Sequence, residues 1–256
     1  MLITATNILV RVFLAPACAA CEALLARPLD GPVCEGCWQA VARTSPPWCA
    51  LCGDPLNDWR ETDPLCARCR RRPPAFALAR SAGRYEGSLR AIVHAFKYDR
   101  RRALAAPLGA LMRRAGADLL PGVDAVVPVP LHPYRTLSRG FNQADDLAGT
   151  LGLPVWRLLR RARHGPPQAG LPAARRHGNV RGAFALRRGV SRSRVRHAAV
   201  VLIDDVMTTG ATVNACAGVL LDAGVRSVGV LTAARASTPR PVARPWPPRP
   251  SVAPHR

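Results

Sequence analysis

Two kinds of hydrophobic pattern alternate between residues 76 and 238 of the chain. In two stretches the apolar residues recur at the i, i+3, i+4, i+7 spacing of one helical face, which predicts amphipathic helices. The apolar positions are Leu89, Ile92, Val93 and Phe96 in the first stretch and Leu104, Leu108, Leu111 and Met112 in the second. Short apolar runs at 125–129 and 198–203 are bounded by turn residues and predict buried strands.

The residues after 198 predict one βαβ unit. The strand at 198–203 is followed by a loop, then by a helical pattern over 211–221 that Gly224 is placed to end. A second apolar run at 225–233 predicts the next strand. Strand, loop, helix and strand at this spacing indicate parallel strands joined by a helix. The expected fold class is therefore α/β, with a mostly parallel sheet flanked by helices.

Composition divides the 256 residues into three parts. Residues 1–75 hold most of the cysteines and many turn-forming residues, and they end at the break Arg70-Arg71-Arg72-Pro73-Pro74. Residues 76–238 form the predicted α/β domain. The tail at 239–256 is rich in Pro and Arg with little to bury, so we expect it to be disordered.

The chain carries 37 basic and 16 acidic residues, a net charge of +21. Such a balance suits a polyanionic partner such as single-stranded DNA. Arginine clusters lie at 70–72, 100–102 and 192–196. Lys97 is the only lysine, however, and an arginine excess in a chain rich in Ala and Pro is equally consistent with GC-rich coding. Charge alone therefore leaves both readings open.

No apolar run reaches the 18 residues of a membrane span, so we expect no membrane insertion. The apolar stretch at 1–14 has no basic residue ahead of it and is interrupted by Arg11, unlike a secretion signal. These features predict a cytoplasmic protein.

Eight of the nine cysteines form four Cys-x-x-Cys pairs before residue 70. The pairs are Cys18/Cys21, Cys34/Cys37, Cys49/Cys52 and Cys66/Cys69. Twelve residues separate the first two pairs and thirteen the last two, a spacing typical of tetrahedral Cys₄ zinc sites. We expect two structural Zn²⁺ ions, with either sequential or interleaved pairing, and redox-active dithiols are the competing interpretation. The ninth, Cys216, is expected to be a small buried side chain.

The chemistry is concentrated where the strand at 198–203 runs into Asp204-Asp205 and then Thr208-Thr209-Gly210-Ala211-Thr212. Ligands of parallel sheets sit beyond the carboxyl ends of the strands. The following helix N-terminus and the threonine hydroxyls suit a phosphate, and Gly210 allows close backbone approach. The aspartates would repel that phosphate but can accept hydrogen bonds from sugar hydroxyls or sit close to Mg²⁺. Together they predict a ribose 5-phosphate site, against the alternative of an ordinary capped βα turn.

This stretch resembles the phosphoribosyl pyrophosphate (PRPP) signature of type I phosphoribosyltransferases. Further motifs resemble the ComF family, phosphoribosyltransferase-like proteins associated with DNA uptake in competent bacteria. The motifs are Tyr85-Glu86-Gly87 through Lys97-Tyr98, Val127-Pro128-Val129-Pro130-Leu131-His132, Arg139-Gly140-Phe141-Asn142-Gln143, Gln168-x-x-Leu171, Arg176, Asn179-Val180 and Ala183-Phe184. The resemblance covers about residues 18 to 235 and implies a type I phosphoribosyltransferase fold preceded by a double zinc ribbon.

The resemblance also implies roles for individual residues. Asp204 and Asp205 would bind the ribose hydroxyls, and Thr208, Thr209, Gly210, Ala211 and Thr212 would hold the 5-phosphate. Arg139 would neutralise charge beside the pyrophosphate loop, with Mg²⁺ bound together with PRPP. Arg176, in a hood at 163–179, is either the catalytic helper or a solvated loop arginine. Phe141 is expected to belong to the core, and neither His132 nor His164 is assigned as a general base.

Three functions are compatible with these residues. The first is a phosphoribosyltransferase with PRPP as donor and an acceptor that the sequence does not specify. The second is a component of the competence machinery that senses PRPP or holds single-stranded DNA without turnover, with other competence proteins as partners. The third is a regulator resembling phosphoribosyltransferases that bind nucleic acid. The sequence indicates no oligomeric state.

Overall fold

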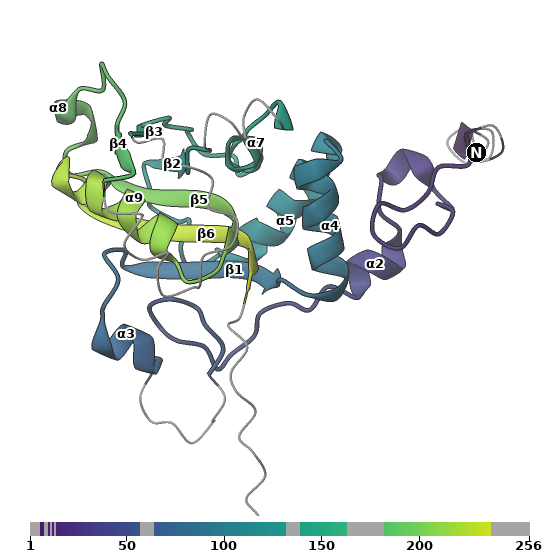
Figure 1. The fold of residues 1–256 in the computed structure, drawn as a ribbon, viewed down its shortest axis with the longest axis horizontal. Helices are drawn as coiled ribbons and strands as arrows, with labels where there is room; N and C mark the ends of the chain where they lie inside the picture. Colours follow the sequence, from purple (N-terminus) through teal and green to yellow (C-terminus); the bar gives the residue numbers. More distant parts are fainter. Residues whose placement is uncertain are drawn as a thin grey trace, which may run out of the picture.

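The structure, a computed structural model, describes residues 6–7, 10, 12, 14–56, 64–131, 139–162 and 182–236. At its centre is a four-stranded, fully parallel sheet with strand order β1-β6-β5-β2 (Figure 1). A separate antiparallel pair, β3 and β4, completes the strands described. The strands are β1 (Leu78–Arg84), β2 (Ala125–Pro128), β3 (Leu159–Arg161), β4 (Phe184–Leu186), β5 (Ala199–Met207) and β6 (Ser227–Arg235). The expected parallel sheet is confirmed.

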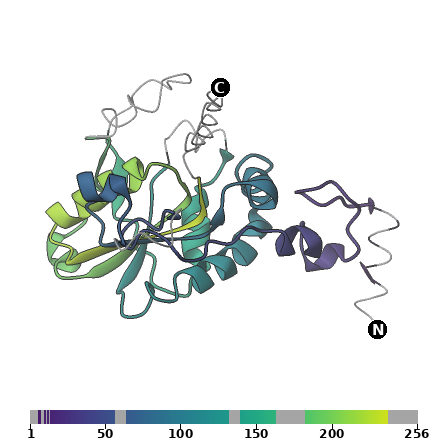
Figure 2. The ribbon, with the colours of Figure 1, turned by 90° about the horizontal axis from the view of Figure 1, so that it is seen from below.

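Helices cover both faces of the sheet (Figures 1 and 2). The longer ones are α4 (Gly87–Tyr98), α5 (Ala105–Ala115), α7 (Gln143–Gly149) and α9 (Ala211–Asp222). The shorter ones are η1 (Pro28–Asp30), α2 (Glu35–Gln39), α3 (Ala67–Arg71), η2 (Arg102–Leu104) and α8 (Arg192–Val195). Helices α4, α5 and α7 share one hydrophobic cluster with the sheet, and α9 shares a second.

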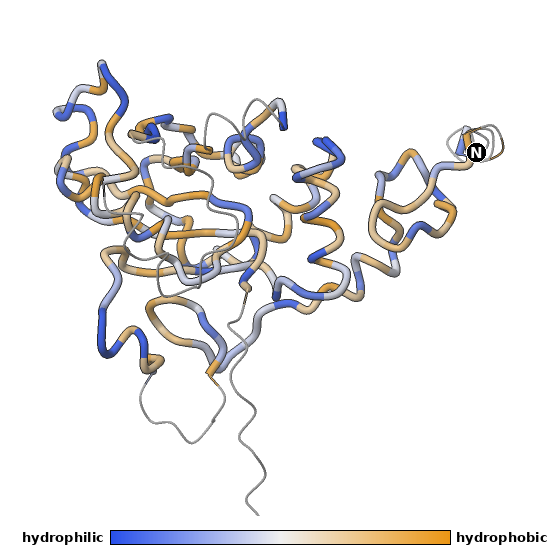
Figure 3. The backbone as a smooth tube through the Cα atoms, viewed as in Figure 1, coloured by the Kyte–Doolittle hydropathy of each residue, from blue (hydrophilic) through white to orange (hydrophobic). Residues whose placement is uncertain are grey.

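Alternate residues of β5 divide between these clusters, as a pleated strand requires. Val201 and Ile203 belong to the cluster with α4, whereas Val200 and Leu202 belong to the cluster with α9. Hydrophobic residues accordingly follow the strands in Figure 3. The four apolar positions predicted for the first helix are fully buried in α4, which confirms that prediction.

Two features differ from the sequence-based expectation. Strand β5 continues past Ile203 to Met207, because β6 stays paired with it until Met207 lies opposite Arg235. The hydrophobic run stops at Asp204, so hydrophobicity alone ended the strand too early. Strand β1 was not expected because its residues Ala79 to Gly83 are mostly small; its pairing with β6 defines it.

The two halves of the cysteine-rich segment pack in different places. The first Cys₄ group lies beside α2 and α4 and contributes Cys18 and Cys37 to the cluster with α4. The second ends in α3 below β1, and all its cysteines belong to the cluster with α9 (Figure 1). The division of the chain at residue 75 stays a prediction.

The second half also covers the outer edge of β1. The N–H of Ala79 donates to the carbonyl of Leu51 at 2.7 Å, and the N–H of Arg84 donates to the carbonyl of Ala42 at 2.7 Å. A Cβ at Gly53, whose φ is +67°, would lie 2.7 Å from the carbonyl oxygen of Ala79. Only glycine therefore allows this knuckle to approach the strand so closely.

Among the residues described, no helix is long and apolar enough to cross a membrane. The predicted tail at 239–256 lies outside the described residues.

Candidate functional site

The loop between β5 and α9 begins a well-formed helix at the edge of the sheet. Gly210 is the N-cap of the 12-residue helix α9 and adopts a left-handed conformation with φ of +77°. A Cβ there would lie 2.8 Å from Cε of Met207. The Oγ1 of Thr209 accepts a hydrogen bond from the N–H of Ala211 at 3.4 Å, while Thr208 is exposed. The loop therefore offers backbone N–H groups and hydroxyls at one exposed edge.

Asp204 and Asp205 precede this loop but lie inside β5, not after it. As neighbours in a strand they point to opposite faces of the sheet. Asp205 is on the α4 face, where its Oδ1 lies 2.7 Å from Nζ of Lys97. Both side chains of this ion pair are 13% exposed, and the ammonium is 5.9 Å from the ring centre of Tyr85. Lys97 was part of a family motif in the sequence, but nothing in the sequence indicated that it pairs with Asp205.

Asp204 is on the α9 face and is half-buried. Its Oδ1 accepts a hydrogen bond from the N–H of Asp205 at 2.8 Å. Burial and the charge of Asp205 raise the pKa of Asp204 to about 7, despite that hydrogen bond and the more distant Lys97. The two carboxylates thus differ in their surroundings: Asp205 forms an ion pair with Lys97, whereas burial raises the pKa of Asp204 to about 7.

The eight paired cysteines form two tetrads, Cys18, Cys21, Cys34 and Cys37, and Cys49, Cys52, Cys66 and Cys69. Within each tetrad all sulfur atoms lie within 4.8 Å of one another, which suits one tetrahedral Zn²⁺. The pairing is therefore sequential, and the interleaved alternative is wrong. Cys216 is fully buried, as expected.

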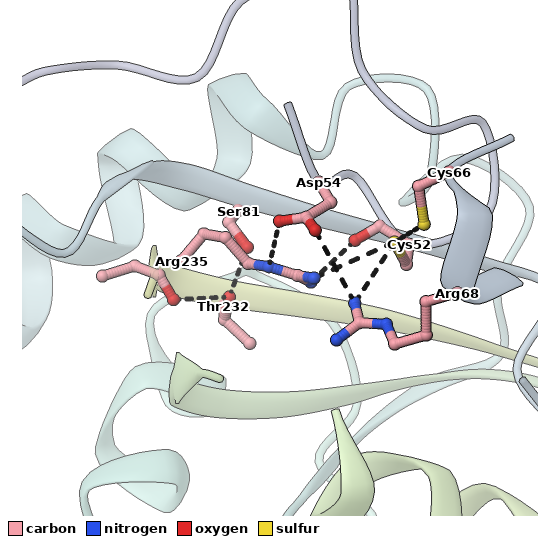
Figure 4. Close-up of polar contacts among 8 residues, drawn as sticks. Cys52, Asp54, Cys66, Arg68, Ser81, Thr232 and Arg235 are labelled. Atoms are coloured by element: carbon pink, nitrogen blue, oxygen red, sulfur yellow. Dashed lines mark hydrogen bonds and ion pairs between the residues drawn. The ribbon is translucent and has the colours of Figure 1, made fainter. Parts of the chain in front are cut away.

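The second tetrad is connected to the sheet by a buried arginine (Figure 4). Arg235, at the end of β6, is 1% exposed. Its Nη1 donates to the carbonyl of Cys52 at 2.8 Å, its Nη2 is 3.8 Å from the Cys52 sulfur, and its Nε is 3.3 Å from Asp54. Nη2 of Arg68 approaches the same sulfur at 3.6 Å. Two guanidinium groups thus offset the negative charge of one metal-binding thiolate, as outer-shell partners do. Neither arginine had a role in the sequence-based prediction.

Comparison with known proteins agrees with these sites. The family model described as "Double zinc ribbon domain" matches residues 9–70. Over 214 residues the chain is 31% identical to competence protein F of Haemophilus influenzae, covering 80% of this chain and 90% of that protein. The chain belongs to the ComF family. The chain is also 33% identical to DNA utilization protein YhgH of Escherichia coli (strain K12), over 77% of this chain and 88% of that protein.

The ComF family assignment confirms the resemblance drawn from the sequence motifs. The α/β domain has the expected mostly parallel sheet flanked by helices, and it is preceded by a zinc ribbon with two Cys₄ sites. Solved structures matched by shape include an allosteric regulatory enzyme of purine biosynthesis, 21% identical with a TM-score of 0.35 over 55% of this chain and 30% of that one. A hypoxanthine phosphoribosyltransferase from Staphylococcus aureus is 17% identical, with a TM-score of 0.30 over 50% of this chain and 62% of that one.

The ComF motif at Arg139 lies beside the end of α4. Nη2 of Arg139 donates to the hydroxyl of Tyr98 at 3.1 Å, and Nη1 donates to Oε1 of Gln143 at 3.2 Å. The guanidinium also lies 4.7 Å from the centre of the Tyr98 ring. Phe141 is buried and its ring centre is 5.7 Å from that of Phe96, which confirms its expected place in the core. The motif residues thus bring Arg139 to the helix that carries Lys97.

Other residues considered in the sequence analysis lie outside the described residues, namely Arg176, the hood at 163–179, His132 and His164. Trp38 packs against the core, and the Trp48 ring lies 5.3 Å from the guanidinium carbon of Arg80. These two tryptophans are therefore occupied by the protein's own contacts.

Proposed function

We propose that this ComF protein binds PRPP at the loop between β5 and α9. The observation that carries the proposal is the succession of Asp204, Asp205 and a Gly210-capped helix at the carboxyl edge of a parallel sheet. Asp204 and Asp205 bind the ribose hydroxyls. Thr208, Thr209, Gly210, Ala211 and Thr212 bind the 5-phosphate, because their N–H and O–H groups are donors at a helix N-terminus.

Positive charge near the pyrophosphate comes from Arg139 and, from the segment outside the described residues, Arg176. Mg²⁺ bound with PRPP would supply further positive charge at the leaving group. The carboxylate oxygens suit such an ion, and Asp204 is the freer of the two because Asp205 already pairs with Lys97.

Transfer from PRPP breaks the bond between ribose C1 and the pyrophosphate oxygen. The electron pair leaves with pyrophosphate, and an acceptor nucleophile forms the new bond to C1 and loses a proton. Arginines and Mg²⁺ stabilise the charge that develops on the leaving group. A PRPP-sensing protein would use the same contacts without turnover. Release of pyrophosphate from PRPP in the presence of candidate acceptors, single-stranded DNA included, separates the two.

Binding itself is tested by calorimetry with Mg²⁺ and PRPP. We expect Asp205→Asn to weaken PRPP binding by roughly ten- to hundredfold, since a charge-assisted hydrogen bond contributes about 1.5–3 kcal/mol. Arg84→Met, which removes an exposed ion pair with Glu86, is a control that leaves the loop intact. Equal PRPP affinity in Asp205→Asn and the unmodified protein would show that the Asp205 carboxylate does not contact the ribose.

We further propose a role in DNA uptake, because the chain is similar to competence protein F and to the DNA utilization protein YhgH. Weak, sequence-independent binding of single-stranded DNA fits the net charge of +21 and the exposed arginines that end α3. These proposed functions imply a cytoplasmic location, because PRPP is a cytoplasmic metabolite and zinc binding requires reduced cysteines.

Charge reversal at Arg70–Arg72 is expected to weaken DNA binding and to leave PRPP affinity unchanged. Phosphate contacts give a salt slope near −0.7 per contact for single strands, so the reversal should also reduce that slope. Reversal of the arginines beyond Pro239 is the control. An equal effect of the two reversals would mean that the charge acts only as a general background.

A further inference from the structure

A pocket of about 620 Å³ lies between the second zinc ribbon and the first turn of α9. Arg68 and Arg72 line it from the ribbon and its exit, Phe76 from the approach to β1, and Thr209 and Asn214 from the loop and α9. We call it the ribbon pocket. Its volume lies within the range of about 300–1,000 Å³ usual for small-molecule sites.

The ribbon pocket is beside the proposed PRPP site and does not coincide with it. Thr209, Gly210 and Ala211 form part of its wall. Thr208 and Thr212, at the two ends of the loop, do not line it, and neither do Asp204 and Asp205. The three central loop residues therefore belong both to the wall of this pocket and to the proposed 5-phosphate site.

Apart from the tetrad cysteines Cys52 and Cys69, the polar side chains of the pocket wall offer donors. The Oδ1 of Asn214 accepts from the N–H of Ala75 at 2.6 Å, which leaves its amide N–H groups for a ligand. Thr209 Oγ1 accepts from Ala211, which leaves its O–H to donate. Arg68 is oriented by the Cys52 sulfur and Asp54, and Arg72 is exposed at the mouth. No Asp or Glu is among the lining residues. Such a wall favours an anion rich in acceptors.

The rest of the wall is formed by Cys52 and Cys69 of the second tetrad and by an apolar part, which consists of Pro73, Pro74, Phe76 and Met207 with alanines of α9. An apolar wall facing a few convergent donors suits a ligand with a flat ring at one end and a charged group at the other. We propose that the ribbon pocket binds a nucleoside monophosphate group, with the base against the apolar wall and the phosphate at Arg72. The group is either a free mononucleotide or the terminal residue of a single strand.

Because the ribbon pocket and the proposed PRPP site share the central loop residues, a ligand in the pocket restricts the loop that would hold the 5-phosphate. This consequence rests on the proposed PRPP function. By linkage, each ligand must then change the affinity of the other by the same factor. Occupation of the ribbon pocket itself does not depend on PRPP.

The test is calorimetry with AMP, adenosine and inorganic phosphate near physiological salt, and with a short oligonucleotide bearing either a 5′-phosphate or a 5′-hydroxyl. We expect Arg72→Glu to weaken AMP binding at least about tenfold, and its neighbour Arg71→Glu, which does not line the pocket, to change it less than about twofold. Ala215→Phe, which fills the pocket without changing charge, should also block AMP. Asp205→Asn should leave AMP binding intact, so that failure of the PRPP proposal is distinguished from failure of this one.

Preference for the 5′-phosphorylated strand, abolished by Arg72→Glu, supports a strand end as the source, and AMP binding supports a free nucleotide. Equal effects of the Arg71 and Arg72 reversals overturn the proposal, because they would indicate general surface charge. Binding independent of the phosphate group also overturns it. Competitive displacement of AMP by PRPP that is lost in Asp205→Asn would mean that the pocket is part of the PRPP site.

Discussion

Replacing Arg235 with methionine is expected to destabilise the whole α/β domain, although the residue lies far along the chain from the zinc ligands it contacts. Methionine preserves an unbranched side chain of roughly the same length as the arginine stem but lacks the guanidinium. The carbonyl of Cys52 then loses its donor, and Asp54 keeps only the 3.9 Å contact with Arg68. Breaking a buried charge pair by removing one partner costs about 3–5 kcal/mol.

Thermal unfolding measures this effect. A loss of that size corresponds to a fall in Tm of roughly 6–20 °C, at about 2–4 °C per kcal/mol for a chain of this length. Arg84→Met is the matched control, because its ion pair with Glu86 is half exposed and worth at most about 1 kcal/mol. The second zinc should also leave faster to a chelator, since Cys52 loses one of its two guanidinium neighbours.

A double variant separates lost charge balance from lost packing. Combining Arg235→Met with Asp54→Asn removes both charges, so its destabilisation should be smaller than the sum of the single changes. If Arg235→Met melts within about 2 °C of Arg84→Met, the buried guanidinium does not contribute what its contacts indicate, and the reasoning is refuted.

Three further predictions concern the metal and the loop. Elemental analysis should give two Zn²⁺ per chain, and Cys216→Ala should leave that number unchanged; iron–sulfur absorbance or metal-free folded protein would contradict the Cys₄ assignment. PRPP binding should weaken and release more protons as pH falls from about 8 towards 6, because Asp204 is protonated below a pKa of about 7 and must ionise to accept from the ribose. Calorimetry in buffers of different ionisation enthalpy measures both effects, and Asp204→Asn should lose that part of the proton release. Gly210→Ala should weaken PRPP binding while α9 remains helical by circular dichroism, because φ is +77° and the added Cβ would meet Met207; unchanged affinity would show that the loop tolerates another conformation.

The sequence predicted the elements whose signal is local. The helical spacing from Leu89 to Phe96 and the apolar runs of β5 and β6 suffice for a parallel sheet, and paired cysteines at fixed spacing suffice for two zinc sites. Strand β1 escaped notice because pairing with β6, not composition, makes it a strand.

The parts of the site that the sequence did not reveal depend on contacts between distant residues. The ion pair of Lys97 with Asp205 spans more than a hundred positions, and Arg235 reaches Cys52 across 183. One arginine among many carries no local mark of burial. The ribbon pocket likewise exists only because the second zinc ribbon folds back against α9.

The covering of the β1 edge by residues 42–53 has a consequence for the protein when zinc is scarce. An uncovered edge strand presents free N–H and C=O groups to any other chain and promotes edge-to-edge aggregation. In this protein the segment that blocks the edge is held in place by the second metal ion, since Cys49 and Cys52 flank Leu51. Zinc starvation would therefore reduce the amount of usable protein through self-association.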